Sequence, residues 1–361
     1  MGISIPAVSS PDDRHHEPEG EVWVGVRIEG TESPLRAEAI RSALARAGAP
    51  FVEPTVYPDS SITAVHDQAL VDWQATAHDE WVRAGLDRDP GQDRVVPYIF
   101  PHPGLLEGID PIEPSSASAR AGRYVYDTMT LIAPGTWKAA RAAADVALTA
   151  AGLVESGTQA TYGLCRPPGH HAARSAIGGS CYLNNSAIAA GSLAGTGRVG
   201  VLDIDAHHGN GTQSIFYEDP GVLTCSVHVD PREGWFPHFF GLAGETGRGP
   251  GEGTNRNLPL PAGTGDREWL AGVEGLLDWL LAGGAGKLVV ALGLDAAAGD
   301  PEGPFEVSEA GYRSAGRLIG AAGLPTVFIQ EGGYALDTLG DLVIAALEGF
   351  EEGAASATGD A

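Results

Sequence analysis

Residues 201–213, VLDIDAHHGNGTQ, place two aspartates and two histidines within six residues, directly behind an apolar run. Asp203, Asp205 and His207 alternate along the chain, so in an extended segment their side chains share one face. Carboxylates and an imidazole can hold a divalent metal, and three protein ligands with an open position are typical of catalytic zinc. Asp295, at the end of another strand-like run, is the expected third ligand. Turn capping accounts for one such aspartate, but not for the set.

Polar clusters follow four apolar, strand-like runs. The run at 160–165 leads into RPPGHH, 198–205 into DIDAHHGN, 287–293 into GLDAAAGD and 325–330 into EGGY. In open parallel sheets, sites form beyond the carboxyl ends of the strands. We therefore expect the four clusters to meet in space, which is stronger evidence for a site than any one motif.

Strand-like and helix-like segments alternate along the chain. Apolar runs occur at 21–27, 160–165, 198–205, 222–229, 287–295 and 325–333, and helical patterns at 33–48, 135–154, 183–195, 266–284, 308–323 and 337–350. This alternation predicts one α/β domain, residues 21–350, with a parallel sheet covered on both faces. Residues 1–20, including His15 and His16, and the tail 351–361 are expected to be loose and exposed.

Two long segments depart from this alternation. Residues 95–123 are rich in proline, glycine and serine and predict an extended loop, which at this length is usually a lid or an interface element. Glu107 and Glu113 within it could contact a cationic substrate, although solvated positions are the simpler interpretation. Residues 230–265 predict a second loop. Its GRGPGEG run lacks the Lys-Ser/Thr pair and the strand–helix context of a phosphate-binding loop.

The net charge of −25 argues against nucleic-acid binding and permits a cationic substrate. The three cysteines show no CxxC spacing, which argues against a disulfide framework or a cysteine zinc site. The sequence shows no apolar run of membrane-spanning length and no secretory signal pattern, so we expect no membrane association and a cytoplasmic location.

Five motifs together resemble the zinc-dependent histone deacetylase family: RPPGHH, GGSCYLNNSA, LDIDAHHGNGTQ, GLDAAAGDP and EGGYAL. The likeness is closer to its class II branch and to the bacterial acetylpolyamine amidohydrolases, and it extends from about residue 21 to 350. It implies a single-domain arginase/deacetylase fold, with an open, mostly parallel β-sheet between helical layers.

The resemblance also implies roles for individual residues. Asp205, His207 and Asp295 would bind one catalytic Zn²⁺. His170 and His171 would lie beside the attacking water, with His171 as general base, and Tyr334 would hydrogen-bond the scissile carbonyl. Asp203 would orient His170, and Asn210 would contact His171. A structural K⁺ would be bound by Asp203, Asp205, His207, Ser226 and Val227.

Further positions bear on the substrate. Glu302 resembles an acidic gatekeeper that selects a distal ammonium group; an exposed turn glutamate is the alternative. Ser180 stands where the family usually has a tunnel aromatic, while Trp235 and Phe236 would form the opposite wall, and Gly179 and Gly332 would also line the site. Cys181 is expected to be a small buried packing residue, and His208 a buried hydrogen-bonding residue. His102, His228 and His238 are weaker substrate-contact candidates.

The leading hypothesis is a zinc amidohydrolase that deacetylates a small cationic amine such as an acetylpolyamine. The 95–123 loop resembles an insertion that builds a homodimer and narrows the entrance. Alternatives are a lysine deacetylase acting on peptides or proteins, a deacetylase of a biosynthetic intermediate, a two-Mn²⁺ ureohydrolase, and an inactive acetyl-binding module. The paired histidines and Tyr334 argue against the last two.

Overall fold

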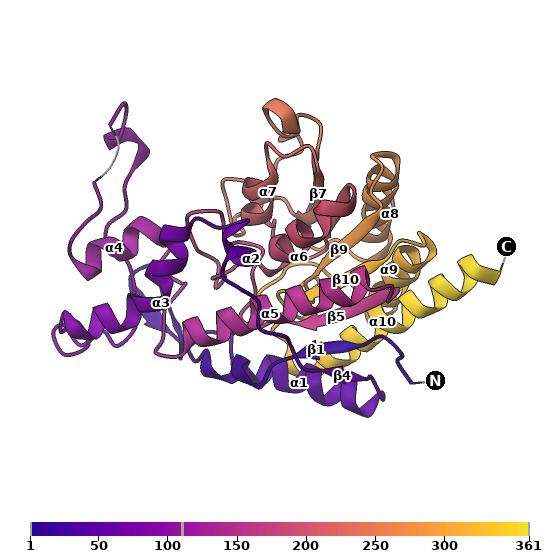
Figure 1. Cartoon of the computed structure of the whole chain (residues 1–361), viewed down its shortest axis with the longest axis horizontal. Helices are drawn as coiled ribbons and strands as arrows, with labels where there is room; N and C mark the ends of the chain where they lie inside the picture. Colours follow the sequence, from indigo (N-terminus) through magenta and orange to yellow (C-terminus); the bar gives the residue numbers. More distant parts are fainter. Residues whose placement is uncertain (1, 110–111, 360–361) are drawn as a thin grey trace.

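The computed structural model describes residues 2–109 and 112–359 (Figure 1). Eight strands form one sheet in the order β4-β1-β5-β10-β9-β6-β7-β8, and every neighbouring pair is parallel. Its strands are β1 (Ala7–Ser9), β4 (Phe51–Val52), β5 (Ala160–Leu164), β6 (Val199–Asp203), β7 (Val222–Val229), β8 (Asn255–Leu260), β9 (Lys287–Leu292) and β10 (Thr326–Gln330). The predicted parallel sheet is confirmed.

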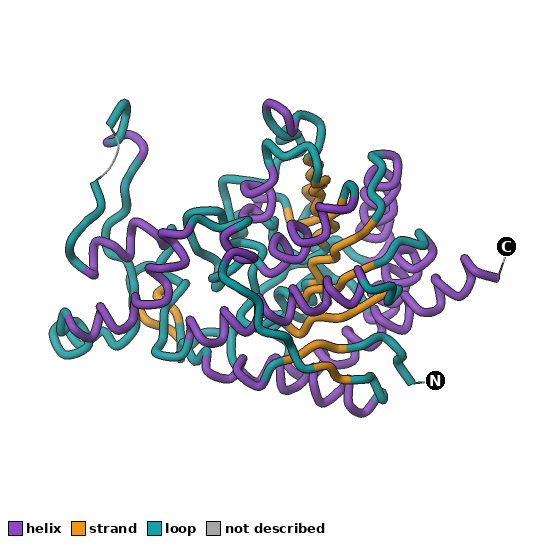
Figure 2. Tube along the Cα trace, viewed as in Figure 1, coloured by secondary structure: helices purple, strands orange, loops and turns teal. Residues whose placement is uncertain are grey.

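Helices cover both faces of this sheet (Figure 2). One apolar cluster joins the sheet to α1 (Pro34–Arg46), α8 (Asp266–Ala282), α9 (Glu309–Ala321) and α10 (Leu336–Gly359). The other joins it to α3 (Gln68–Arg83), α5 (Thr136–Glu155), α6 (Asn185–Leu193) and α7 (Asn210–Phe216), with the short α2 (Ser60–Thr63) beside them. The predicted layered α/β fold is therefore confirmed, and each predicted helical pattern corresponds to a helix.

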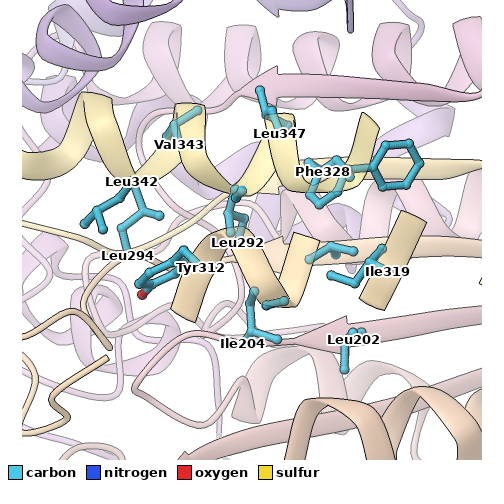
Figure 3. Packing of buried hydrophobic residues seen from close by; sticks show 14 of the residues in the cluster. Leu202, Ile204, Leu292, Leu294, Tyr312, Ile319, Phe328, Leu342, Val343 and Leu347 are labelled. Carbon is cyan, nitrogen blue, oxygen red and sulfur yellow. The ribbon is translucent and has the colours of Figure 1, made fainter. Parts of the chain in front are cut away.

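The first cluster shows how the strands are held. Leu292 of β9 and Phe328 of β10 pack against Val343 and Leu347 of α10, all fully buried (Figure 3). Phe328 also meets Phe350 edge to face, with ring centroids 5.5 Å apart. Each fully buried side chain of this size contributes roughly 1.5–3 kcal/mol. This packing fixes the strands whose carboxyl ends carry the polar clusters.

Both chain ends are more ordered than expected. β1 lies inside the sheet between β4 and β5, a 3-10 helix follows at Pro11–His15, and His16 is fully buried. The apolar Ile3 and Ile5 join the core, which explains why a polar-looking segment is anchored. The tail continues α10 to Gly359, and Arg313 of α9 pairs with Glu348 and Glu352 of this helix. The prediction of a loose 1–20 and a loose tail was wrong over these described parts.

Residues 21–27 do not join the main sheet. They form an antiparallel hairpin of β2 (Glu21–Trp23) and β3 (Val26–Ile28), closed by Val24 and Gly25 with φ of 50° and 80°. Positive φ at both central residues gives the turn that matches strand twist. Val24 is 83% exposed. An apolar run indicated a buried strand, but here it builds an exposed ribbon.

The two predicted loops contain regular elements. The 95–123 segment extends away from the body in Figure 1 and carries a 3-10 turn (Pro103–Leu105) and most of α4 (Ala117–Tyr124), whose Ser116 Oγ accepts the Ala119 N–H. Its residues 110–111 lie outside the described residues. The 230–265 segment contains β8, which pairs with β7 at the sheet edge. No helix in the described parts of the chain combines the length and apolar character needed to cross a bilayer.

Candidate active site

The four polar clusters meet as predicted. β5, β10, β9 and β6 are consecutive in the sheet and parallel, so their carboxyl ends lie side by side at one edge. The segments after these strands therefore converge on one volume.

Asp205, His207 and Asp295 form a compact group whose potential ligand atoms all lie within 4.8 Å of one another. His207 Nδ1 is 3.2 Å from Asp205 Oδ1 and 3.1 Å from Asp295 Oδ2, and both carboxylates are fully buried. Burial and the neighbouring Asp205 raise the pKa of Asp295 to about 7. Two buried carboxylates around one imidazole nitrogen need a cation, and this oxygen and nitrogen donor set suits zinc. The residues fit the implied metal.

Glycines allow the two carboxylates to approach this closely. A Cβ on Gly293 would lie 2.1 Å from Asp205 Oδ2, and one on Gly332 would lie 2.1 Å from Asp295 Oδ2. The Gly332 N–H donates to Asp205 Oδ2 at 2.9 Å. Gly332, predicted to line the substrate site, therefore orients a candidate metal ligand.

The tandem histidines lie beside this group with different partners. His170 Nδ1 is 3.0 Å from Asp203 Oδ2, and His171 Nδ1 is 2.7 Å from Asn210 Oδ1. Burial lowers the pKa of His170, but Asp205 and Asp203 outweigh it and raise the value to about 10. Burial, with the charges of its histidine neighbours, holds the pKa of His171 well below its usual value. The surroundings therefore favour the cationic form of His170 and the neutral form of His171.

Tyr334 completes the set from the loop after β10. Its ring lies 4.5 Å from the Arg36 guanidinium, which also donates to the Glu331 and Gly333 carbonyls. Burial raises the pKa of Tyr334 well above its usual value, against the opposing charge of Arg36, so the phenol stays a proton donor.

A cavity of about 90 Å³ leads to these groups. Phe236 forms one wall and meets the His171 ring edge to face at 4.8 Å. Gly179 permits this contact, since a Cβ there would lie 2.4 Å from His171 Cδ2. The remaining lining residues include His207, Ser180, Met129, Thr31, Glu21, Glu302 and Tyr334.

A sequence model described as the histone deacetylase domain matches residues 30–350. This chain belongs to the histone deacetylase family. Acetylpolyamine amidohydrolase 2 of Pseudomonas aeruginosa is 37% identical to this deacetylase over 347 residues, covering 95% of this chain and 98% of that protein. The acetylpolyamine amidohydrolase of Mycoplana ramosa is 37% identical over 345 residues, covering 95% and 98%.

The solved structures agree with the sequence relatives. The crystal structure of acetylpolyamine aminohydrolase from Burkholderia pseudomallei superposes with a TM-score of 0.91 at 37% identity, covering 97% of this chain and 99% of that one. These findings confirm the predicted family, its arginase/deacetylase fold and the class of enzyme, a hydrolase of amide bonds.

Several predicted residues of this deacetylase lie away from the cavity. Trp235 packs at the apolar core with its ring 6.4 Å from that of His207, instead of lining the cavity. His228 is buried, between Ser226 Oγ and the Gly241 carbonyl, and His208 is buried on Gln213. Substrate contact by His228 is therefore excluded by its burial.

The other candidates have surface or packing positions. His102 accepts the Gly104 N–H at an exposed turn, and Cys181 is fully buried. In the 95–123 segment, Glu107 is exposed, while Glu113 pairs with Arg120 at 3.1 Å. His238 lines a larger cavity of about 1070 Å³, which shares Met129 and Phe236 with the first.

Sequence reasoning missed four residues of this deacetylase that the structure brings to the site. Glu331 is fully buried and accepts the Gly169 and His170 N–H groups and the Ser186 hydroxyl. The EGGY motif contains Glu331, but the motif does not predict that this side chain points toward the tandem histidines.

Of the others, Glu21 and Thr31 line the cavity, and Asp127 lies close enough to act on Glu21. Asp127 accepts the N–H groups of Gly179, Met129 and Thr130. Glu21 lies in a segment interpreted as a buried strand, and burial with the charges of Glu302 and Asp127 raises its pKa to about 7. Thr31 Oγ donates to Glu302 Oε1 at 2.8 Å. No local motif marks these three.

Proposed function

We propose that this deacetylase hydrolyses the N-acetyl amide of a small cationic amine, such as an acetylpolyamine, to acetate and the free amine. One observation carries the proposal. The cavity that ends at the candidate metal ligands and Tyr334 also exposes two carboxylates, Glu21 and Glu302, with Asp127 close enough to act on Glu21. A negative entrance above an amide-hydrolysing site favours a cation at one end and an acetyl group at the other.

The candidate metal group supplies the activation that amide hydrolysis needs. Asp205, His207 and Asp295 would hold a zinc ion, which would supply Lewis acidity and would lower the pKa of a bound water from 15.7 to about 7. Asp205 and Asp295 are themselves oriented by backbone N–H groups, from Gly332 and Ala206 respectively. Hydrogen bonds of this kind keep the metal ligands in position and adjust how strongly they bind the metal.

The two histidines divide the proton transfers. His171, neutral and fixed at Nδ1 by the Asn210 carbonyl oxygen, presents Nε2 to accept a proton from the attacking water. The same nitrogen then delivers that proton to the leaving amine. His170, held by Asp203, keeps a positive charge beside the developing oxyanion. Asn210 adds no negative charge, so it leaves His171 free to begin as a base.

Tyr334 acts on the carbonyl oxygen. Its protonated phenol donates a hydrogen bond where negative charge develops when water adds to the amide carbon. The Arg36 contacts to the Glu331 and Gly333 carbonyls hold the backbone directly before Tyr334.

A structural potassium site is a second element of the proposal, formed by Asp203, Asp205, His207, Ser226 and Val227. The register of β6 and β7 pairs Asp203 with Ser226, which supports it. A potassium ion there would brace the strand ends that carry two metal ligands.

We also propose a homodimer built through residues 95–123. Tyr98, Leu105 and Ile112 in this segment are 73%, 78% and 85% exposed, more apolar surface than a solvated loop needs. Deleting the segment should leave a monomer in light scattering, with the metal content retained. A dimeric deletion variant would remove the segment from the interface.

The substrate is tested by turnover of the zinc-loaded enzyme, followed by mass spectrometry. The panel compares acetylputrescine, longer acetylpolyamines, acetyl-lysine peptides and acetylated amino sugars. The proposal expects the highest kcat/KM for acetylated diamines and polyamines. A preference for acetyl-lysine peptides or acetylated amino sugars would overturn the small-amine assignment.

A further inference from the structure

Asp300 is a buried carboxylate that contacts two parts of the site through the backbone. It is 6% exposed. Its Oδ2 accepts the Tyr334 N–H at 2.7 Å and the Ala335 N–H at 3.0 Å, and its Oδ1 accepts the Glu302 N–H at 3.0 Å. Among the described residues it forms no ion pair. These three backbone N–H groups therefore stabilise the carboxylate of Asp300, and the carboxylate in turn fixes the backbone at the three donors.

The two parts it contacts lie at different ends of the proposed substrate. Tyr334 belongs to the carbonyl end, and Glu302 offers a carboxylate to the cation end. They are 32 residues apart in the chain, on the loops after β10 and β9. One carboxylate oxygen is committed to each loop, so Asp300 connects them directly.

Glu302 has a second anchor. Its Oε1 accepts the Thr31 hydroxyl at 2.8 Å, while its N–H is held by Asp300. Both the backbone and the side chain of Glu302 are thus fixed. A carboxylate fixed at both ends can discriminate by distance, whereas a freely rotating one only attracts positive charge.

We propose that Asp300 is a positioning residue that sets the spacing between Tyr334 and Glu302, so that the enzyme selects amines by the distance between the acetylated nitrogen and the next cationic nitrogen. This rests on the proposed deacetylation of a cationic amine. Asp300 does not touch the substrate. Thr31 assists by holding the Glu302 side chain at the set distance.

The chemistry of the side chain explains why an aspartate is needed. A carboxylate accepts hydrogen bonds at both oxygens, while an asparagine has one accepting oxygen and an NH₂ group that cannot accept an N–H. Asp300→Asn can satisfy the Tyr334 loop or Glu302, but not both. Asp300→Ala satisfies neither.

The test measures kcat and KM for N-acetyl diamines of increasing methylene number, with an uncharged N-acetyl alkylamine beside them. The wild type should show a sharp optimum of chain length. Asp300→Asn should reduce about tenfold the ratio of kcat/KM between the best diamine and its neighbours in length. Asp300→Ala should reduce this ratio too, and it should also lower kcat on the uncharged amide on the order of 10²-fold, which is the effect of about 1 Å of misplacement. Thr31→Val should flatten the optimum with a smaller loss of kcat on the uncharged amide than Asp300→Ala.

Asp266→Ala is the matched control, because Asp266 also accepts a backbone N–H, but from Ser308 instead of from Tyr334 or Glu302. If Asp300→Asn keeps the wild-type optimum, or if the Asp300 and Asp266 variants lose activity only in proportion to melting temperature, Asp300 is merely structural and the inference is overturned. A wild type that hydrolyses none of these amides would instead refute the proposed function, and the inference with it.

Discussion

The metal side of the cavity and its entrance are built in different ways. At the metal side, Asp205 and Asp295 come from the ends of adjacent strands, are fully buried and lie against glycines. At the entrance, Glu21 comes from an exposed hairpin and Glu302 from the loop after β9, and Asp127, in the segment after α4, acts on Glu21 from nearby. The first region is fixed by the sheet, and the second is assembled from loops.

This difference suggests that the two regions have different tasks, the reaction itself at the metal side and the selection of the substrate at the entrance. Glycine contacts and backbone N–H donors leave the candidate metal ligands almost no freedom, which suits a reaction that tolerates little displacement. The loops at the entrance can vary without disturbing the sheet. Variants of the two regions should therefore differ in kind: the metal side should govern kcat, and the entrance should govern KM and selectivity.

The largest effect is expected at the metal side. Asp295→Ala removes a candidate ligand, so bound zinc, measured by mass spectrometry of the metal, should fall, and turnover should drop to that of the chelated protein. Asp278→Ala, an exposed position on α8, is the control. Full zinc content and activity in Asp295→Ala would remove Asp295 from the metal site.

Tyr334→Phe should lower kcat by on the order of 10²–10³ while zinc stays bound, because one oxyanion donor is lost. The ring and its contact with Arg36 remain, so KM should change little. Steady-state kinetics on one acetylated amine is sufficient. Unchanged turnover would show that Tyr334 does not act on the carbonyl.

Glu302→Leu tests the entrance. It should raise KM for acetylated diamines about tenfold, equivalent to ~1.4 kcal/mol of lost attraction, and leave KM for an uncharged acetyl-amide nearly unchanged. Glu302→Gln separates charge from shape. Equal changes for the charged and uncharged substrates would contradict the gatekeeper role and weaken the contrast between the two regions.

A smaller effect is expected in the support behind the tandem histidines. His66 Nδ1 is 3.0 Å from the Ala173 carbonyl oxygen, its Nε2 accepts the Asn184 N–H, and burial lowers its pKa to about 4. Below pH 6.5 the unfolded chain binds a proton that the folded chain refuses. The contribution of His66 to the free energy of unfolding should thus fall by up to about 3 kcal/mol between pH 6.5 and 4, and then level off.

His66→Gln removes this titration, so its unfolding free energy, from denaturant melts across the same pH range, should fall less steeply than that of the wild type. His15→Gln, at a half-exposed position, is the control. Parallel pH dependences in wild type and His66→Gln would show that His66 is not held neutral.

The sequence predicted that the candidate metal ligands lie together, because they stand in short motifs at strand ends. The two-residue alternation of an extended segment was enough to predict that Asp203, Asp205 and His207 share one face. The parallel sheet then predicted that Asp295 would lie near them. The helices were visible because each buries one apolar face over several turns.

The entrance could not be predicted in the same way. Glu21 stands in an apolar run that indicates a buried strand, and no periodicity separates that from an exposed hairpin. Asp127 accepts the N–H of Gly179, which is 52 residues away in the chain. The strand β1 is three residues long, too short for its alternation to be recognised. Each depends on tertiary contacts that local patterns do not encode.

The placement of β1 has a consequence for how the protein is made. The 3-10 turn after β1 and His16 offer carbonyls to Arg166, which opens the segment leading to the tandem histidines, and Glu32 binds the same guanidinium. β1 pairs with β5, about 150 residues later. During synthesis the first residues must wait for β5 to leave the ribosome before they can dock. The segment that carries the histidine pair is thus fully held only after residues 7–16 have docked, so activity should appear late in folding.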